Sequence, residues 1–213
     1  MWVTTQTRPE MMYDACKVSN VGKHPKVNNL VEANLALQKL KSKKGHINFL
    51  NLGNPNQLKV ICYSDATYAS LPDGSSQGGF IVFVQGSNGL LSPLCWSSKK
   101  LNRVTRSPLA SEAVALNEAA DAAFLISAMI QEIFQLPNFP PVLCRTDSAS
   151  LVETLQSTNL VTDKRLRIDV ARLREMEKLN EVHIEWVKGI EQLSDPLTKS
   201  GASAELLREV LHC

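Results

Sequence analysis

Apolar and polar residues follow a strand-like pattern in the middle of the chain. The runs 58–65, 79–84 and 91–98 are rich in β-branched and aromatic residues, and turn-like segments containing glycine, serine and asparagine separate them. This pattern predicts three successive strands. Because the connections between the runs are short, we expect the strands to form an antiparallel meander.

A helical pattern follows these strands. Ser107 and Pro108 form a typical helix start, because a serine hydroxyl can cap the first turn and proline fits the first helical position. Small and apolar residues then recur at helical spacing as far as Phe134. The prolines that begin at Pro137 predict the end of this long helix.

The rest of the chain alternates between strand and helix patterns. Residues 142–147 and 182–189 are predicted to be strands, and residues 163–180 a helix. Shorter helices are expected from Ser148 and from the segment 193-LSDPL-197. The element order is then three strands, a helix, a strand, two helices, a strand and a helix. This order predicts an α/β domain with a mixed sheet covered by helices.

Residues 1–56 differ from the rest and define a helical, basic segment ahead of a domain at 57–213. A helix is expected over 29–44, and 45–57 is expected to give a short strand and a turn. We expect the apolar stripe of the helix to be buried, against the domain or by self-association, and its lysines to stay exposed. The stripe consists of Leu30, Ala33, Leu37 and Leu40, and the lysines are Lys39, Lys41, Lys43 and Lys44.

Composition limits the class of protein. The chain has 213 residues, of which 44% are hydrophobic and 21% charged, so it can bury a substantial core and disorder is not expected. Its five cysteines lack C-x-x-C spacing, which favours reduced thiols over disulfides or zinc. The longest uncharged apolar run, 122–130, is too short to span a membrane, and no signal peptide pattern follows Met1. We therefore expect an intracellular, cytoplasmic protein without a membrane partner, and a nuclear location stays open.

Four acids lie at the ends of the predicted elements. Asp65 ends the first strand, Glu112 lies in the opening turns of the long helix, Asp147 ends the fourth strand and Asp195 begins the last helix. The first and fourth strands can be parallel neighbours in a mixed sheet, so their carboxyl ends would meet at one edge. Four converging carboxylates repel one another unless a cation neutralises them. Oxygen ligands of this kind favour Mg²⁺ or Mn²⁺.

Each acid also has an ordinary structural explanation. An aspartate after a strand is commonly a turn residue, and a glutamate near a helix start is favoured by the helix dipole. An aspartate before a proline, like Asp195, is commonly a helix cap. His183, in the middle of a predicted strand, is expected to be packed and not catalytic. The combination of four acids at element ends is what favours a metal site.

The four acids lie in four sequence blocks, which are 63-YSDATYA-69, 96-WSSKKLNRVTRSPLASEAVALNEAA-120, 145-RTDSASLVETL-155 and 190-IEQLSDPLTKS-200. In this order the blocks resemble the ribonuclease H domain of Ty1/copia-type retrotransposon Pol polyproteins. Residues 2–15 and 39–52 resemble the segment that connects the reverse transcriptase to that domain. The resemblance implies a ribonuclease H-like fold, with a mixed five-stranded sheet of three antiparallel and then two parallel strands flanked by helices. It also implies that the catalytic, metal-binding acids are Asp65, Glu112, Asp147 and Asp195.

A function follows from this resemblance. It implies a metal-dependent endonuclease that hydrolyses the RNA strand of RNA/DNA hybrids during reverse transcription. Two Mg²⁺ or Mn²⁺ ions would activate the attacking water and stabilise the charge on the leaving 3′ oxygen and the scissile phosphate. Two groups of basic residues are expected to contact phosphates without sequence specificity. They are Lys99, Lys100, Arg103 and Arg106 before the long helix, and Lys164, Arg167, Arg174 and Lys178 on the later helix.

Two alternatives stay open at the level of the sequence. Another kind of nuclease can use the same fold, and it would differ in not requiring ribonucleotides in its substrate. The other alternative is a non-catalytic or host-adopted module that binds nucleic acid or a protein. The partner of residues 1–56 is also open between a reverse transcriptase and a second copy of the chain. No Y-x-D-D polymerase signature occurs, so the chain is not expected to copy nucleic acid by itself.

Overall fold

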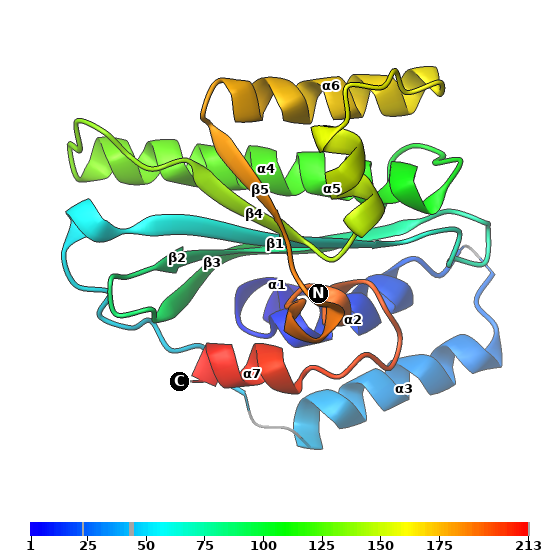
Figure 1. Cartoon of the computed structure of the whole chain (residues 1–213). Helices are drawn as coiled ribbons and strands as arrows, with labels where there is room; N and C mark the ends of the chain where they lie inside the picture. The colour runs from blue at the N-terminus through cyan, green and yellow to red at the C-terminus, as the bar shows by residue number, and fades with distance from the viewer. Residues whose placement is uncertain (23, 43–44, 213) are drawn as a thin grey trace.

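A five-stranded sheet in the order β3-β2-β1-β4-β5 forms the centre of the molecule (Figure 1). The structure is a computed structural model and describes residues 1–22, 24–42 and 45–212. Neighbouring strands are antiparallel among the first three and parallel from β1 to β4 and from β4 to β5. The strands are β1 (Lys59–Thr67), β2 (Gln77–Gln85), β3 (Leu91–Lys100), β4 (Val142–Thr146) and β5 (Val182–Trp186). The predicted ribonuclease H-like sheet of three antiparallel and then two parallel strands is confirmed.

Helices cover both faces of this sheet (Figure 1). On one face lie α4 (Pro108–Ile133), α5 (Ala149–Gln156) and α6 (Lys164–Lys178). On the other side lie α1 (Trp2–Gln6), α2 (Met12–Ser19), α3 (Val27–Ser42) and α7 (Glu205–His212). Short 3₁₀ helices connect these elements, namely η1 (Pro9–Met11), η2 (Pro55–Gln57), η3 (Gly189–Glu191) and η4 (Asp195–Leu197).

Alternate residues of β1 point into two separate hydrophobic cores, as the period of a strand requires. Val60 and Cys62 pack in the core formed with α4, α5 and α6. Ile61 and Tyr63 pack in the core formed with α2, η4 and α7. Because both faces are covered, β1 and β2 are buried along almost their whole length, which accounts for the continuous apolar runs in the sequence.

The long helix α4 begins where the sequence predicts. Ser107 Oγ accepts a hydrogen bond from the backbone N–H of Ala110 at 3.1 Å, and Pro108 occupies the first turn. By length and composition α4 is able to cross a membrane, but 56% of its most apolar window is buried within this fold. Leu116 and the neighbouring alanines pack against the sheet, which is typical of the core helix of a globular domain.

Residues 1–56 pack on the sheet through α2. Met12 is buried in the same core as Ile61. Trp96 Nε1, on β3, donates a hydrogen bond to the backbone oxygen of Thr4 at 2.9 Å. Within the single chain this segment therefore packs against the domain, the first of the two expected arrangements, and self-association stays a prediction.

The leucine stripe of α3 does not take part in this packing. No residue of α3 is buried, and Leu30 and Leu37 are 63% and 51% exposed. Ion pairs to α2, such as Lys39 Nζ to Asp14 Oδ2 at 3.0 Å, hold this helix. The domain therefore does not bury either leucine, and burial of the stripe by self-association stays a prediction. Lys41 is exposed, and Lys43 and Lys44 lie outside the described residues.

The strand expected within 45–57 does not form. The backbone N–H of Asn48 donates to the oxygen of Leu211 at 3.0 Å, and that of Leu50 donates to Ser92 Oγ at 3.1 Å. These bonds go to α7 and to a side chain, and not to the ladder of a neighbouring strand. The segment is therefore a linker that ends at η2.

The expected packing of His183 is also wrong, because β5 is an edge strand. The His183 side chain is 63% exposed, and its Nε2 lies 3.8 Å from Glu185 Oε1. Val182 and Ile184, which alternate with it, face the core instead. Within the described residues, Cys16, Cys62, Cys95 and Cys144 are free thiols.

Replacing Met12 by alanine should lower the free energy of unfolding by about 2–5 kcal/mol, because it removes a buried side chain from the core beneath β1. Urea denaturation measures this change. Val27→Ala is the matched control, since Val27 is 81% exposed, and its effect should stay within about 0.5 kcal/mol. Equal, small effects of both substitutions would mean that residues 1–56 do not belong to the folded core.

Candidate metal centre

The parallel pairing of β1 with β4 brings Asp65 and Asp147 together. Tyr63 lies beside Arg145 in this register, so continuing it by two residues places Asp65 beside Asp147. Asp147 directly follows β4, as predicted. Asp65 lies inside β1, which continues to Thr67 and is thus longer than the sequence pattern indicates.

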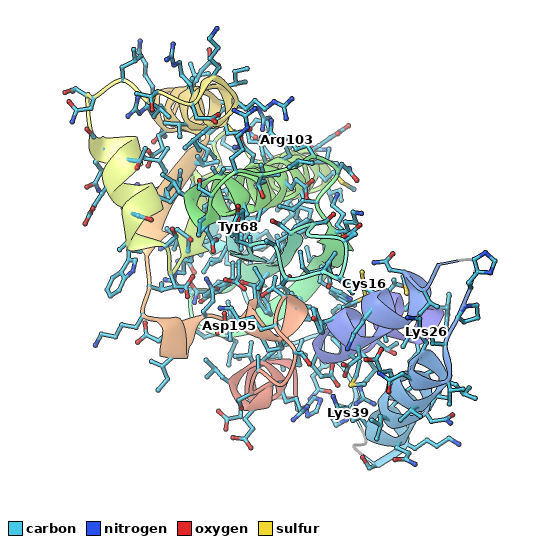
Figure 2. All side chains as sticks on the ribbon, turned by 90° about the vertical axis from the view of Figure 1, so that its right-hand side faces the viewer. Cys16, Lys26, Lys39, Tyr68, Arg103 and Asp195 are labelled. Atoms are coloured by element: carbon cyan, nitrogen blue, oxygen red, sulfur yellow. The ribbon has the colours of Figure 1, made fainter. Side chains whose placement is uncertain are left out.

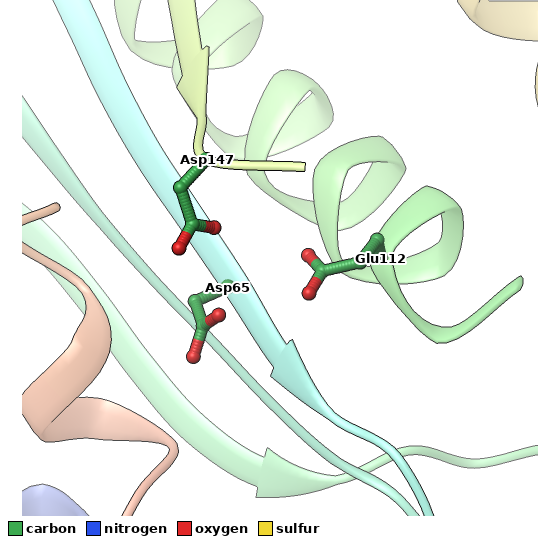
Figure 3. Close-up of side chains that lie close together, drawn as sticks. All are labelled: Asp65, Glu112 and Asp147. Carbon is green, nitrogen blue, oxygen red and sulfur yellow. The ribbon is translucent and has the colours of Figure 1, made fainter. Parts of the chain in front are cut away.

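Glu112 reaches the same place from α4. It lies one helical turn before Leu116, which is fully buried against the sheet. One carboxylate oxygen from each of Asp65, Glu112 and Asp147 lies within 4.8 Å of the other two. Figure 3 shows the carboxylate of Glu112, on α4, directed toward the two aspartates, which lie close together. The structure therefore brings together three of the four predicted acids, and we call these three the acidic trio.

Asp195 lies beside the acidic trio, and a lysine binds its carboxylate. Lys199 Nζ lies 2.6 Å from Asp195 Oδ1 and 3.3 Å from Asp65 Oδ1. Asp195 is not a helix cap, because Ser194 holds that position and no side chain caps η4. The expected last helix at this point is a single 3₁₀ turn, and the carboxylate of Asp195 is bound to the residue four positions later.

The turn that follows Asp195 also orients Asp65. Thr198 Oγ1 donates a hydrogen bond to Asp65 Oδ2, and Ser98 Oγ donates to the backbone oxygen of Leu197 at 2.5 Å. Gly79 lies opposite Asp65 in β2, and a Cβ there would come within 2.8 Å of Leu197 Cβ. Glycine at this position is what allows the turn to approach the sheet. The sequence reasoning missed the roles of Gly79, Thr198 and Lys199.

The acidic trio is electrostatically strained without a cation. Burial, and then the charges of Asp65 and Asp147, raise the pKa of Glu112 to about 9. Burial also raises the pKa of Asp65, and the charge of Lys199 and the hydrogen bond from Thr198 offset only part of this effect. Burial lowers the pKa of Lys199, but its hydrogen bond to Asp195 and the charge of Asp65 outweigh burial, so its pKa lies above the ordinary value.

One oxygen of the acidic trio lacks a partner. Glu112 Oε2 is buried and accepts no hydrogen bond within the described part of the chain. An unpaired buried carboxylate oxygen is costly unless another group compensates it. A divalent cation between these carboxylates would provide that compensation, so the residues present fit the implied Mg²⁺ or Mn²⁺.

The basic residues predicted before α4 each lie next to an acid. Lys99 Nζ lies 3.3 Å from Glu118 Oε2, and Arg106 Nη1 lies 3.6 Å from Asp163 Oδ2. Their side chains remain 43% and 72% exposed, so both can still reach a ligand. Lys100 is paired with Asp73 and Arg103 with Asp169. Figure 2 shows Arg103 at the α4 side of the molecule and Lys39 on α3 at the opposite side.

The basic residues predicted on α6 fall into two kinds. Lys164 and Lys178 are exposed. Arg167 Nε donates to the backbone oxygen of Val161 at 2.8 Å, and Arg174 Nε to that of Leu155 at 3.0 Å. The two arginines therefore support the connection between α5 and α6, whereas the two lysines are free to face a ligand.

Sequence comparison shows which known proteins are related to this chain. No family model matches the chain. The retrovirus-related Pol polyproteins from transposons RE1 and RE2 of Arabidopsis thaliana are each 28% identical to it over 198 residues, which is 91% of this chain. This chain is a homologue of retrotransposon Pol polyproteins. It spans 13% of the length of the two Pol polyproteins. The relationship to retrotransposon Pol polyproteins, expected from the sequence blocks, is confirmed.

Solved ribonuclease H structures are similar to this Pol homologue. The N-terminal RNase H domain of a Mycobacterium tuberculosis protein is 18% identical, with a TM-score of 0.47 over 66% of this chain and 91% of that one. RNase H1 from Halobacterium salinarum is 20% identical, with a TM-score of 0.46 over 71% of this chain and 98% of that one. The foamy viral protease-reverse transcriptase in complex with an RNA/DNA hybrid is 12% identical, with a TM-score of 0.45 over 78% of this chain and 24% of that one.

Proposed function

We propose that this chain is a metal-dependent endonuclease that cuts the RNA strand of RNA/DNA hybrids during the reverse transcription of a copia-type retroelement. The observation that carries the proposal is the convergence of Asp65, Glu112 and Asp147, one of which, Glu112, has a buried unpaired oxygen. Homology with Pol polyproteins supports a nuclease of the ribonuclease H type over the unrelated functions that one fold can host.

Each acid has a separate role in this proposal. The acidic trio would hold a Mg²⁺ or Mn²⁺ ion, and Asp195 would complete a second site shared with Asp65. When bound, such ions supply an activated water and neutralise charge at the scissile phosphate. Asp65 is the best candidate to serve both ions, because its carboxylate belongs to the trio and also contacts Lys199, the partner of Asp195. Thr198 keeps the Asp65 carboxylate in this orientation through its hydrogen bond.

The substrate proposal depends on the exposed basic residues near α4 and on α6. Phosphate contacts from Lys99, Lys100, Arg103 and Arg106 would give an affinity that falls with salt and does not depend on base sequence. Lys164 and Lys178 would extend this surface. Arg167 and Arg174 would hold the connection between α5 and α6 in place. Selection of a hybrid further requires contacts with the 2′-hydroxyl groups of the RNA strand, which line the minor groove.

A panel of three duplexes tests the proposed function. The full chain is incubated with an end-labelled RNA/DNA hybrid, duplex RNA or duplex DNA, each with Mg²⁺ and with EDTA. We expect cutting of the RNA strand in the hybrid only, with Mg²⁺ only, to give 5′-phosphate and 3′-hydroxyl ends. Cutting of duplex DNA would instead indicate another nuclease on this fold. Binding of the hybrid without cutting, under all metal conditions, would indicate a non-catalytic module.

A further inference from the structure

We infer that the ammonium group of Lys199 is a built-in counter-cation, which occupies the space between Asp65 and Asp195 before ions bind and must leave when a second divalent ion binds there. This inference rests on the proposed metal-dependent function. It adds that the two ions are not equivalent. Lys199 contacts one member of the acidic trio, Asp65, but it contacts both carboxylates of the second site, so it is the second ion that competes with this residue most directly.

The ammonium group of Lys199 contacts both Asp65 and Asp195. Its Nζ lies 2.6 Å from Asp195 Oδ1 and 3.3 Å from Asp65 Oδ1, so one positive charge joins two carboxylates that would otherwise face each other. The Asp65 side chain is only 2% exposed, and that of Asp195 is 26% exposed. The ammonium group therefore offsets the charge of both carboxylates.

The local structure shows that this contact is held in place. The backbone N–H of Lys199 donates to the oxygen of Asp195 at 3.1 Å, which closes the turn that carries both side chains. The preceding residue, Thr198, donates its hydroxyl hydrogen to Asp65. Two consecutive residues of one turn therefore bind the same carboxylate, and the turn itself is held against Gly79 of the sheet.

Lys199 also has room to leave. It lines two pockets of about 450 Å³ and about 680 Å³, and both are also lined by the segment that follows η4. Its side chain is 39% exposed and has a flexible four-carbon stem. A divalent ion bound to Asp65 and Asp195 would repel an ammonium group held within a few ångströms, so the lysine would turn toward one of these pockets.

Titration of the full chain with Mn²⁺, followed by the electron paramagnetic resonance signal of free Mn²⁺ at constant pH, tests this inference without a cleavage assay. In Lys199→Met the second ion should bind at least about tenfold more tightly than in the wild type, because the positive charge of the lysine no longer repels it. Affinity for the first ion should change much less. Lys199→Arg, which keeps the charge, should behave like the wild type.

Lys39→Met is the matched control, because Lys39 lines one of the same pockets and pairs with Asp14 but contacts none of the four acids. It should leave both affinities unchanged. Lys199→Gln serves as a second neutral variant that retains hydrogen-bonding groups at this position. Tighter binding of the second ion in both neutral variants supports the inference.

Three results would overturn it. If both neutral variants bind the second ion as the wild type does, or more weakly, Lys199 only orders the turn. If no variant and no wild-type protein binds Mn²⁺, the metal centre of the proposed function fails as well. Binding of one ion by the wild type with no change in the variants would contradict only the inference about Lys199.

Discussion

Asp147→Asn and Asp65→Asn should each reduce cleavage of the RNA strand of a hybrid by more than about a hundredfold. Loss of an outer-shell partner of a metal ligand already costs about 10- to 100-fold, and these two residues are proposed as ligands themselves. Initial rates with an end-labelled hybrid and Mg²⁺ measure the effect. Asp121→Asn is the control, because Asp121 lies on the outer surface of α4, paired with Arg172, and its loss should change the rate less than about twofold.

The two variants should differ in stability when metal is absent. Asp147→Asn removes a repulsive charge from the acidic trio, so its free energy of unfolding should rise slightly in EDTA. Asp65→Asn also relieves repulsion, but it breaks the contact with Lys199 and weakens the bond from Thr198, so it should gain less. Full cleavage activity in both variants would contradict the catalytic assignment of these residues.

The metal-free protein should lose stability as the pH rises from about 4.5 toward 9, and Glu112→Gln should remove most of this dependence. The pKa of Glu112 is about 9 in the folded protein, against an ordinary value of 4.5. Between these values the folded state holds a proton that the unfolded state has released. The free energy of unfolding therefore falls with pH, with a limiting slope of about 1.4 kcal/mol per pH unit for one proton.

Urea denaturation in EDTA at several pH values between 5 and 9 measures this slope (roughly one proton per molecule at its steepest). Glu118→Gln on the same helix is the matched control, because Glu118 is paired with Lys99 and lies outside the acidic trio. It should keep the slope of the wild type. A Glu112→Gln variant that also keeps it would show that Glu112 is ionised in the metal-free protein. Added Mg²⁺ should stabilise the wild type more at pH 8 than at pH 6, since the ion requires the ionised carboxylate.

Most of the sheet was predictable because its signals are local. Both faces of β1 and β2 are covered, so these strands are apolar throughout, and Ser107 with Pro108 starts α4 as the pattern indicates. The edge of the sheet was less predictable. His183 has the sequence context of a packed residue, and only the position of β5 at the edge leaves it exposed.

The segment ahead of the sheet shows a second limit of sequence patterns. The stripe with Leu30 and Leu37 predicts a buried helix face, but α2 provides the buried contact through Met12. Helical periodicity identifies an apolar face and not the partner that covers it. The segment 45–57 shows the same limit, because its backbone donates to α7 and to the Ser92 side chain of β3 and not to the ladder of a strand.

At the metal centre, the sequence identified the acids but not the groups around them. Asp65, Glu112 and Asp147 were predictable from element ends that the fold brings together. Asp195 followed by Pro196 resembles a cap, and the signal for its actual partner is the spacing of four residues to Lys199. The hydroxyl of Thr198 on Asp65 and the close approach at Gly79 depend on how η4 packs on the sheet, which no local pattern specifies.

Anomalous diffraction from crystals of the full chain grown with Mn²⁺ tests whether Asp65, Glu112 and Asp147 together bind a divalent cation. We expect an anomalous peak between the three carboxylates, with Glu112 Oε2 among the ligands, and loss of this peak in Asp147→Asn. Well-occupied Mn²⁺ elsewhere on the protein, with none between these carboxylates, would contradict it.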